Sequence, residues 1–359
     1  MKICFLAPSI KTGGGNRVFI ELANRLCDKY DVYIVYPNNS IEKNTFADTR
    51  KVKYMQIGTY SSSKVNKVIN LFRCISYING KFERDVKLVI SDPIFSLFIP
   101  FIKNRCRIYR FVQADDYRIY DDGGILGRGL ILKLYKLLCL KSYRYKVSYI
   151  FNSQFVYSQY CLDAKRNDVP YQLVHPAINH LVFNNVRKKK YSGCSICLVA
   201  RKHPLKGLIT FINVYGSLPL EIKSKIAHVT LISHDDLSEF DTRGMDVVKP
   251  ACDEDIAYVY QTSDIFISTS WWEGFGLPPL EAMACGCAVI TSKSGGVNEY
   301  AKDNDNCLMF EPKNEVELTE KLIRLINEDN LRNKLSQEGV KTAQNFDWNK
   351  SALQLIEIL

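Results

Sequence analysis

Short apolar runs alternate with longer stretches of helical periodicity along the first half of the chain. Five runs have the length and the β-branched or aromatic content of buried strands: KICFLAP, DVYIVYP, KLVIS, RIYRFVQ and SYIFNS. Between the first two, RVFIELANRLCDKY places Phe19, Leu22 and Leu26 on one helical face. Strands separated by helical segments are typical of parallel βαβ units, so the pattern predicts an α/β fold with a doubly wound sheet.

The most apolar segment is LVISDPIFSLFIPFI, which begins at residue 88. Asp92 and Pro93 interrupt it, and it is too short to cross roughly 30 Å of hydrocarbon. We expect a buried strand, then a short helix with Asp92 as its N-cap and Pro93 as its first residue. The sequence therefore predicts no transmembrane span.

A second set of strands follows the basic stretch VRKKKYSG at 186–193: CSICLVA, HVTLIS, DIFISTS and CAVITS. We predict two Rossmann-like domains, residues 1–185 and 192–342, facing each other across a cleft. The final run NFDWNKSALQLIEIL has helical periodicity. We expect a helix over 343–359 that packs back on the first domain.

Charge changes sign at the same place. Residues up to Lys190 contain 32 Lys and Arg against 14 Asp and Glu, whereas the rest contains 16 against 24. A basic first half favours an anionic partner, either nucleic acid or anionic lipid. We expect no nucleic acid, because no recognition motif accompanies the charge.

The twelve cysteines mostly lie inside apolar runs, which is typical of buried thiols in a reducing compartment. Cys194 and Cys197 form a C-x-x-C, but no second pair at ligand spacing supports a zinc or redox site. The start MKICFLAPS has none of the features of a cleavable leader. We expect a cytoplasmic protein.

Glycines occupy the first strand-to-helix turn, PSIKTGGGNRV. The spacing from Gly13 through Gly15 to Val18 lacks the third small residue of a dinucleotide fingerprint, and the second strand ends without an acidic residue. The turn is either a plain connection or a loop whose backbone N–H groups face a phosphate or sugar.

Two cations follow the first strand of the second domain, in ARKHPLKG. Arg201 and Lys206 stand at the carboxyl end of that strand, where open α/β sheets bind ligands. A guanidinium, which can donate two parallel hydrogen bonds, and an ammonium group in one turn favour a diphosphate ligand.

Two carboxylates flank a glycine-rich turn in WWEGFGLPPLEAMACG. Pro278 and Pro279 predict the start of a helix, with Glu281 in its first turn and Glu273 just beyond the preceding strand. Carboxylates accept paired hydroxyl donors, so the two side chains favour a sugar or ribose ligand.

The stretch EGFGLPPLE resembles the E-x7-E signature of retaining glycosyltransferases of family 4, which have the GT-B fold. The resemblance extends to further segments along nearly the whole chain: SIKTGGGNRVFIELANRL, NSQFV with HPAIN, ARKHPLKG, SKSGGVNEY and FDWNKSA. It implies an enzyme of bacterial surface-polysaccharide assembly, such as capsule or O-antigen, with an acceptor-binding first domain and a nucleotide-sugar-binding second domain.

The resemblance also implies roles for residues. Arg201 and Lys206 would bind the donor diphosphate and stabilise the leaving nucleotide, Glu281 would hold the ribose, and Glu273 would contact the donor sugar as a third catalytic residue. The donor would also lie against the backbone of Gly14, Gly15, Gly274, Phe275, Gly276 and Leu277.

One position departs from the family pattern. Many relatives have a histidine near the anomeric centre, where this chain has Gln113, followed by Asp115 and Asp116. Gln113 can hydrogen-bond a sugar hydroxyl but cannot act as an acid or base. Asp115 either orients an acceptor hydroxyl or caps the next turn.

Two D-x-D runs, Asp253–Asp255 and Asp303–Asp305, have the form that metal-dependent glycosyltransferases use. Neither closes a strand beside the predicted pocket. We expect no metal and no other cofactor, because cationic side chains and helix N–H groups can neutralise the diphosphate.

The segment 127–146, GRGLILKLYKLLCLKSYRYK, is predicted to be a basic helix. It is either a core helix with a solvated edge or a peripheral contact with anionic lipid. Two alternatives to a glycosyltransferase stay open: a sugar-nucleotide 2-epimerase of the same fold, and a non-catalytic partner subunit.

Overall fold

A computed structural model describes residues 1–11, 14–39, 51–82, 86–103, 106–115, 117–118, 129–186 and 192–359. The chain divides into two compact units. Unit 1 comprises Met1–Pro176 and Trp348–Leu359, and unit 2 comprises Ala177–Asp347. The division at Pro176 falls before the boundary near 185–192 that the change of charge predicts; within that stretch, residues 187–191 lie outside the described part.

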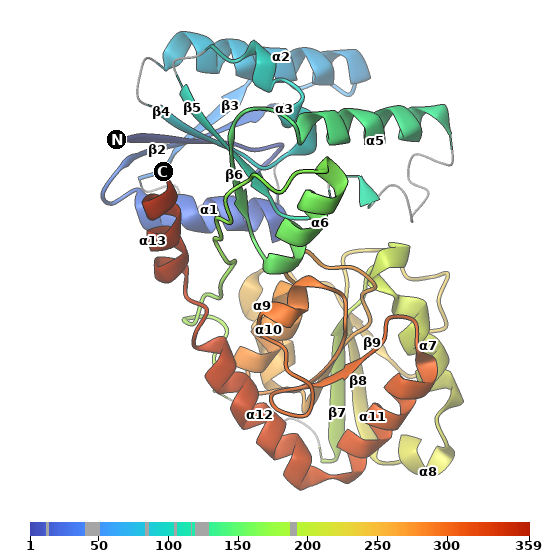
Figure 1. Ribbon diagram of the computed structural model, residues 1–359. Helices are drawn as coiled ribbons and strands as arrows, with labels where there is room; N and C mark the ends of the chain where they lie inside the picture. Colours follow the sequence, from blue (N-terminus) through green and yellow to red (C-terminus); the bar gives the residue numbers. More distant parts are fainter. Residues whose placement is uncertain are drawn as a thin grey trace. The chain divides into compact units, whose positions relative to one another are not determined.

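Unit 1 is built on a six-stranded parallel sheet of order β3-β2-β1-β4-β5-β6 (Figure 1). The strands are β1 (Lys2–Leu6), β2 (Asp31–Pro37), β3 (Lys53–Ile57), β4 (Val86–Ile90), β5 (Cys106–Val112) and β6 (Ser148–Phe151). The five predicted strands are confirmed. Strand β3 was not predicted, and its residues KYMQI are only half-buried or exposed.

The helices of unit 1 are α1 (Gly14–Leu26), α2 (Lys64–Lys81), α3 (Pro93–Ser96), η1 (Ile99–Phe101), α5 (Leu130–Ser142), α6 (Gln154–Ala164) and α13 (Trp348–Ile358). The predicted buried face of α1 is confirmed. Asp92 caps α3 as predicted, since its Oδ1 accepts a hydrogen bond of 2.9 Å from the Phe95 N–H. Helix α5 covers the predicted basic helix except its ends, and residues 127 and 128 lie outside the described part.

Helix α13 joins unit 1, although it follows unit 2 in the chain. It packs on α1, and Trp348 at its start is fully buried. The Ser351 hydroxyl donates to the His175 carbonyl at 2.6 Å, and the Tyr109 hydroxyl donates to the Leu359 carbonyl at 3.0 Å. The helix begins at Trp348 rather than at 343, which is the last residue of the preceding helix.

Unit 2 has a second six-stranded parallel sheet, of order β12-β11-β10-β7-β8-β9 (Figure 1). The strands are β7 (Cys194–Val199), β8 (Ile226–Ile232), β9 (Asp246–Val248), β10 (Ile265–Ser268), β11 (Ala288–Ser292) and β12 (Leu308–Phe310). The helices are η2 (Pro204–Lys206), α7 (Leu208–Ser217), α8 (Leu220–Lys223), α9 (Asp253–Gln261), α10 (Leu277–Ala284), η3 (Gly296–Glu299), α11 (Glu315–Asn327) and α12 (Asp329–Ala343). The four predicted strands, β7, β8, β10 and β11, are confirmed.

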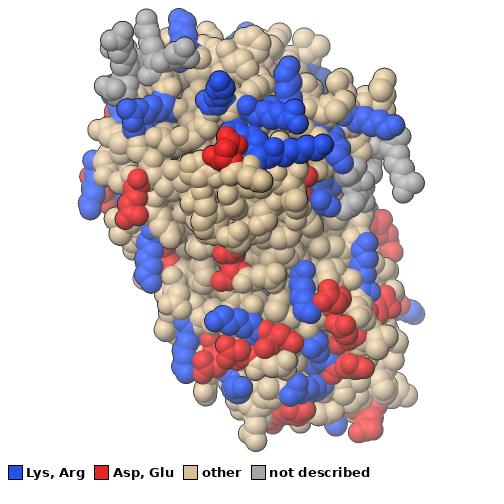
Figure 2. Space-filling view, viewed as in Figure 1, with Lys and Arg blue, Asp and Glu red and all other residues tan. Residues whose placement is uncertain are grey.

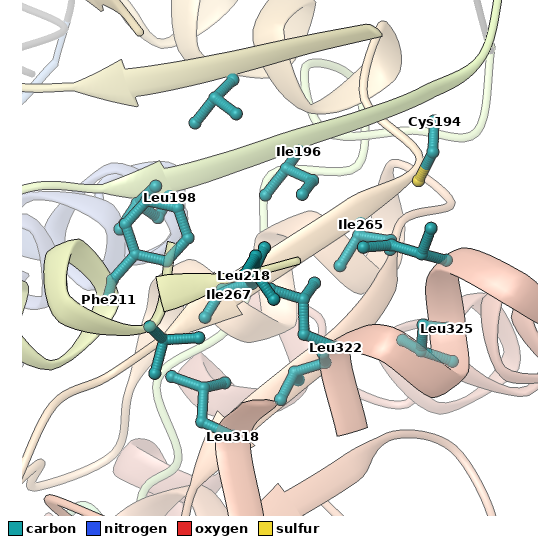
Figure 3. Packing of buried hydrophobic residues seen from close by; sticks show 14 of the residues in the cluster. Cys194, Ile196, Leu198, Phe211, Leu218, Ile265, Ile267, Leu318, Leu322 and Leu325 are labelled. Carbon is teal, nitrogen blue, oxygen red and sulfur yellow. The ribbon is translucent and has the colours of Figure 1, made fainter. Parts of the chain in front are cut away.

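The sheet of unit 2 separates two apolar clusters. One of them, with Leu198, Phe211 and Leu322, fills the space between the sheet, α7 and α11 (Figure 3). Cys194 belongs to this cluster and Cys197 to the other one, so the two thiols of the C-x-x-C face opposite sides of the sheet. Burial raises the pKa of Cys194 to about 12. Both cysteines therefore pack as small apolar side chains.

The described helices include none with the length and apolar character needed to cross a membrane.

Candidate functional site

Both sheets have the same strand order, which reverses direction at one pair of neighbouring strands. The reversal lies between β1 and β4 in unit 1 and between β10 and β7 in unit 2. At such a point the loops leaving the carboxyl ends of the two strands diverge to opposite faces of the sheet, and the crevice between them is where open α/β sheets bind ligands. The candidate site is therefore sought at the loops after these strands.

An ion pair links the loops on either side of the reversal in unit 2. Lys206, which ends η2 after β7, places its Nζ 2.7 Å from Oε1 of Glu273, which follows β10. The Lys206 side chain is 38% exposed and that of Glu273 is 17% exposed. The backbone joins the same loops, because the Trp271 N–H donates to the Leu205 carbonyl at 2.7 Å and the Thr269 hydroxyl donates to the Lys206 carbonyl at 3.0 Å. Two predicted site residues thus meet.

Arg201 is held by a carboxylate that the sequence analysis did not identify. Its Nε donates to Oδ2 of Asp235 at 3.0 Å, and the same oxygen accepts the Lys202 N–H at 2.8 Å. Burial alone would raise the pKa of Asp235, but these hydrogen bonds outweigh it and the pKa is lowered. Asp235 follows β8, the strand next to β7, so position after a strand was the available signal.

The turn between Glu273 and α10 is fixed by the loop after β11. The Glu273 N–H donates to the Ser294 carbonyl, and the Gly296 N–H donates to the Glu273 carbonyl, both at 2.8 Å. A Cβ on Gly296 would lie 2.1 Å from the Gly274 carbonyl oxygen, so only glycine permits this approach. Packing against Gly274 thereby explains the second glycine of SKSGGVNEY.

Tyr300 holds the end of this turn. Its hydroxyl donates to the carbonyl of Gly276, whose φ of +83° favours glycine. Burial raises the pKa of Tyr300 well above its usual value, with the Glu273 carboxylate adding to the effect. The hydroxyl therefore keeps its proton and stays a donor. Tyr300 was not among the predicted site residues.

Glu281 lies in α10, but not where the sequence predicted. The helix begins at Leu277, directly after Gly276, so Glu281 is the fifth residue and the prediction that it lies in the first turn is wrong. The residue is only 5% exposed. No side chain among the described residues caps the N-terminus of α10.

In unit 1 the structure brings Gln113 and Gly15 together. The Gln113 Nε2 donates to the Gly15 carbonyl at 3.2 Å and to the Ser91 hydroxyl at 2.6 Å. The Asn152 Nδ2 donates to the Gln113 carbonyl at 2.7 Å. These residues follow β1, β4, β5 and β6, so they share the carboxyl edge of this sheet. Ser91 and Asn152 were not predicted as site residues.

The remaining predicted positions of unit 1 differ in accessibility. Gly14 begins α1 and is exposed, whereas Gly13 lies outside the described residues. Asp115 is buried and forms an ion pair of 2.7 Å with Arg118. Asp116 also lies outside the described part. Because Asp115 is engaged in this pair, the structure supplies a structural role for it.

Both D-x-D runs take part in local structure. Asp253–Asp255 opens α9, where Asp255 accepts the Ala251 N–H at 2.8 Å. Asp303 accepts the Met309 N–H at 2.7 Å in a turn. Within the described ranges, no three His, Cys, Asp or Glu residues are grouped as ligands for a metal ion.

Comparison with known families identifies part of unit 2. Residues 245–342 match the sequence model of the glycosyl transferases group 1. This segment contains Glu273, the glycine turn and Glu281. Arg201 and Lys206 lie before it.

Two curated relatives illustrate the similarity. An uncharacterised glycosyltransferase of Methanocaldococcus jannaschii is 28% identical over 184 residues, which are 48% of this chain and 46% of that protein. An O-antigen chain mannosyltransferase B of Escherichia coli is 32% identical over 104 residues, 29% of this chain and 27% of the other. The chain thus spans less than half the length of these relatives.

Solved structures match over the whole chain. A sucrose-phosphate synthase from Thermosynechococcus elongatus superimposes with a TM-score of 0.82 at 15% identity, covering 99% of this chain and 98% of that one. Anabaena HepE, solved in complex with UDP-glucose, gives a TM-score of 0.75 at 15% identity, with 100% and 99% covered. The predicted GT-B fold, with two Rossmann-like units, is therefore confirmed.

Proposed function

We propose that the protein is a retaining, metal-independent glycosyltransferase that moves a hexose from a nucleotide diphosphate sugar to a hydroxyl acceptor. The observation that carries the proposal is the Lys206–Glu273 pair at the β7/β10 reversal, which sets a cation for phosphate beside a carboxylate for sugar hydroxyls. The sequence match of residues 245–342 supports it.

The similar proteins support a role in polysaccharide biosynthesis. The similar Escherichia coli protein is an O-antigen chain mannosyltransferase, and the similar Anabaena structure holds UDP-glucose. We propose a glycan or lipid-linked glycan acceptor in polysaccharide biosynthesis, and a cytoplasmic location at the inner face of the membrane.

The proposed chemistry depends on charge placed before the donor arrives. Departure of the diphosphate concentrates negative charge on its oxygens, which fixed cations stabilise without reorganisation. Asp235 holds the Arg201 guanidinium at 3.0 Å, and Glu273 holds the Lys206 ammonium at 2.7 Å. Both cations are therefore oriented in advance, and the donor phosphates and sugar would complete their hydrogen bonding.

A panel of nucleotide diphosphate sugars tests donor binding. A donor that binds only the folded state at 100 times its dissociation constant stabilises it by about 2.7 kcal/mol, which raises Tm by roughly 5–10 °C for a domain of this size. We expect one base and sugar class to give this shift in differential scanning fluorimetry, and the matching nucleoside without phosphates to give none. A panel in which every nucleotide sugar leaves Tm unchanged would contradict donor binding.

The same donor separates the proposal from its alternatives. With an acceptor present, a retaining transferase forms a glycoside with the anomeric configuration of the donor, observable by NMR. An epimerase would convert the nucleotide sugar without an acceptor, and a non-catalytic subunit would leave it unchanged. Either of those two results would overturn the proposed reaction.

Removal of divalent metal is expected to leave transfer unchanged. Arg201, Lys206 and the N-terminus of α10 supply positive charge or partial charge for the leaving diphosphate. The measurement is initial rate with and without excess EDTA, followed by addition of Mg²⁺ or Mn²⁺. A rate abolished by EDTA and restored by either ion would show that a metal participates.

A further inference from the structure

Helix α2 turns an apolar stripe to solvent. Val65, Val68, Ile69 and Phe72 are 69%, 50%, 42% and 52% exposed. Their spacing of three and four residues places them on one side of the helix. The opposite side, with Cys74 and Ile78, is buried against the sheet. The helix therefore has two apolar sides, of which the sheet covers one.

Helix α5 shows the same arrangement. Leu130, Ile131, Leu134 and Leu137 are between 56% and 83% exposed, whereas Leu132 and Cys139 on the other side are buried. The sequence left open whether the leucines of this segment form core or contact lipid. In the structure, these four apolar side chains face solvent.

The segment between the two helices continues the apolar surface. Phe72 of α2 contacts Phe98 edge-to-face with ring centroids 4.8 Å apart, and Phe98 lies beside Phe101, which is 64% exposed. The Asn79 Nδ2 of α2 donates to the Phe101 carbonyl at 3.0 Å, and α3 packs against α5. We call the exposed apolar residues of α2, η1 and α5 the docking surface.

The charges on these elements all have one sign. Helices α2 and α5 contain no acidic residue, and residues 93–101 contain no charged residue. The basic residues of the two helices are Lys64, Lys67, Arg73, Lys81, Lys133, Lys136 and Lys141. Figure 2 shows lysine and arginine side chains gathered over this part of unit 1. Within α2, residues 93–101 and α5, the apolar side chains are accompanied by cations and by no acidic residue, a combination that complements an anionic lipid surface.

We infer that the docking surface binds the surface of an anionic membrane, with the apolar stripes in the acyl boundary and the lysines at the lipid headgroups. A second copy of this chain is a poorer occupant, because a two-fold contact would bring these cations against one another. The inference goes beyond the proposed reaction, since it assigns a binding surface to residues of α2, η1 and α5, none of which is a candidate site residue.

Vesicle binding by the full chain tests the inference without donor or transfer. We expect binding to phosphatidylglycerol vesicles at 0.1 M salt and at least tenfold weaker binding to phosphatidylcholine vesicles. Each Lys or Arg near an anionic surface contributes about fivefold to binding. Raising the salt to 1 M shortens the screening length from about 10 Å to about 3 Å and should release the protein.

Substitutions locate the surface. Ile69→Asp with Phe72→Asp, and separately Leu134→Asp with Leu137→Asp, should each weaken binding by more than about tenfold, because they remove apolar area and add negative charge. A matched pair in unit 2, Leu220→Asp with Val316→Asp, changes side chains that are 84% and 68% exposed and should have no effect. The Ile69 and Phe72 side chains are only partly exposed and Phe72 contacts Phe98, so Tm is measured for each variant and binding is compared below the lowest Tm, where every variant is folded.

Three results would overturn the inference: no binding to phosphatidylglycerol vesicles at 0.1 M salt, equal binding to both lipids, or unchanged binding of both unit 1 variants. A dimer in light scattering that Ile69→Asp with Phe72→Asp dissociates would assign the surface to a second copy instead. Because none of these measurements requires turnover, their failure is distinct from failure of the proposed transfer reaction.

Discussion

Arg201→Ala should lower kcat/KM for transfer by about 10²–10³ without altering the fold, the loss typical of removing one preorganised donor from a developing oxyanion. The side chain is 51% exposed and packs in no apolar cluster, so its removal should not change Tm. Asp235→Asn should cause a smaller loss of the same kind, because Arg201 stays in place but loses its charged partner. The measurement is steady-state kinetics with the donor that the thermal-shift panel identifies.

The chain offers a matched control for this substitution. Arg243 pairs with Asp241 at 2.6 Å on the surface of unit 2, just before β9, the edge strand that lies two strands from β7. Arg243→Ala removes the same side chain and a similar ion pair, and should leave kcat/KM unchanged. Wild-type turnover in Arg201→Ala, or equal losses in Arg201→Ala and Arg243→Ala, would remove Arg201 from the proposed chemistry.

Glu281→Ala should mainly lower nucleotide affinity and Glu273→Ala should mainly lower turnover, because we propose that the two carboxylates hold opposite ends of one donor. Loss of Glu281 should weaken binding of the free nucleotide diphosphate by about 1.5–3 kcal/mol, or roughly 10- to 150-fold, as for a hydrogen bond to a charged group. Loss of Glu273 should not weaken that binding, because the free nucleotide has no sugar. Turnover should nevertheless fall strongly, since the sugar is no longer held.

The structure sharpens the second half of this prediction. Glu273 is the ion-pair partner of Lys206, so Glu273→Ala releases the ammonium for a phosphate and should leave nucleotide affinity equal or slightly greater. Calorimetric titration with nucleotide diphosphate, beside the transfer assay, measures both effects. Glu311→Ala is the control, because the Glu311 carboxylate forms a surface ion pair with Lys293 at the same distance of 2.7 Å. Equal loss of nucleotide affinity in Glu273→Ala and Glu281→Ala would contradict the proposed division.

Apart from the short β12, strands whose residues are mostly buried could be predicted from the sequence, and exposed strands could not. The predicted strands consist mostly of buried apolar residues, so their composition identifies them. Strands β3 and β9 lie at sheet edges and are largely exposed or half-buried, and β12, also at an edge, has only three residues. Edge position alone does not hide a strand, because β6 also lies at an edge and was predicted: three of its four residues are buried.

Long-range geometry limited the prediction of the site. Position after a strand was enough to select Arg201, Lys206 and Glu273. The partner of Arg201 lies 34 residues further on, and only the adjacency of β7 and β8 brings it near. The position of Glu281 was wrong because Gly276, at positive φ, lets the helix begin one residue before Pro278. Periodicity likewise predicted the helix at α5 but not that Leu130, Leu134 and Leu137 face solvent.

Because α13 belongs to unit 1, unit 2 is inserted within the sequence of unit 1 and is synthesised before unit 1 is complete. Residues 177–347 form one continuous stretch, whereas unit 1 needs both Met1–Pro176 and Trp348–Leu359. A ribosome must therefore complete unit 2 before it makes the helix that covers α1 and buries Trp348. During that interval the side of α1 that packs on α13 lacks its cover, which is the kind of exposed surface that invites misfolding and chaperone binding. Unit 1 begins first on the ribosome but can be completed only after unit 2 has been made.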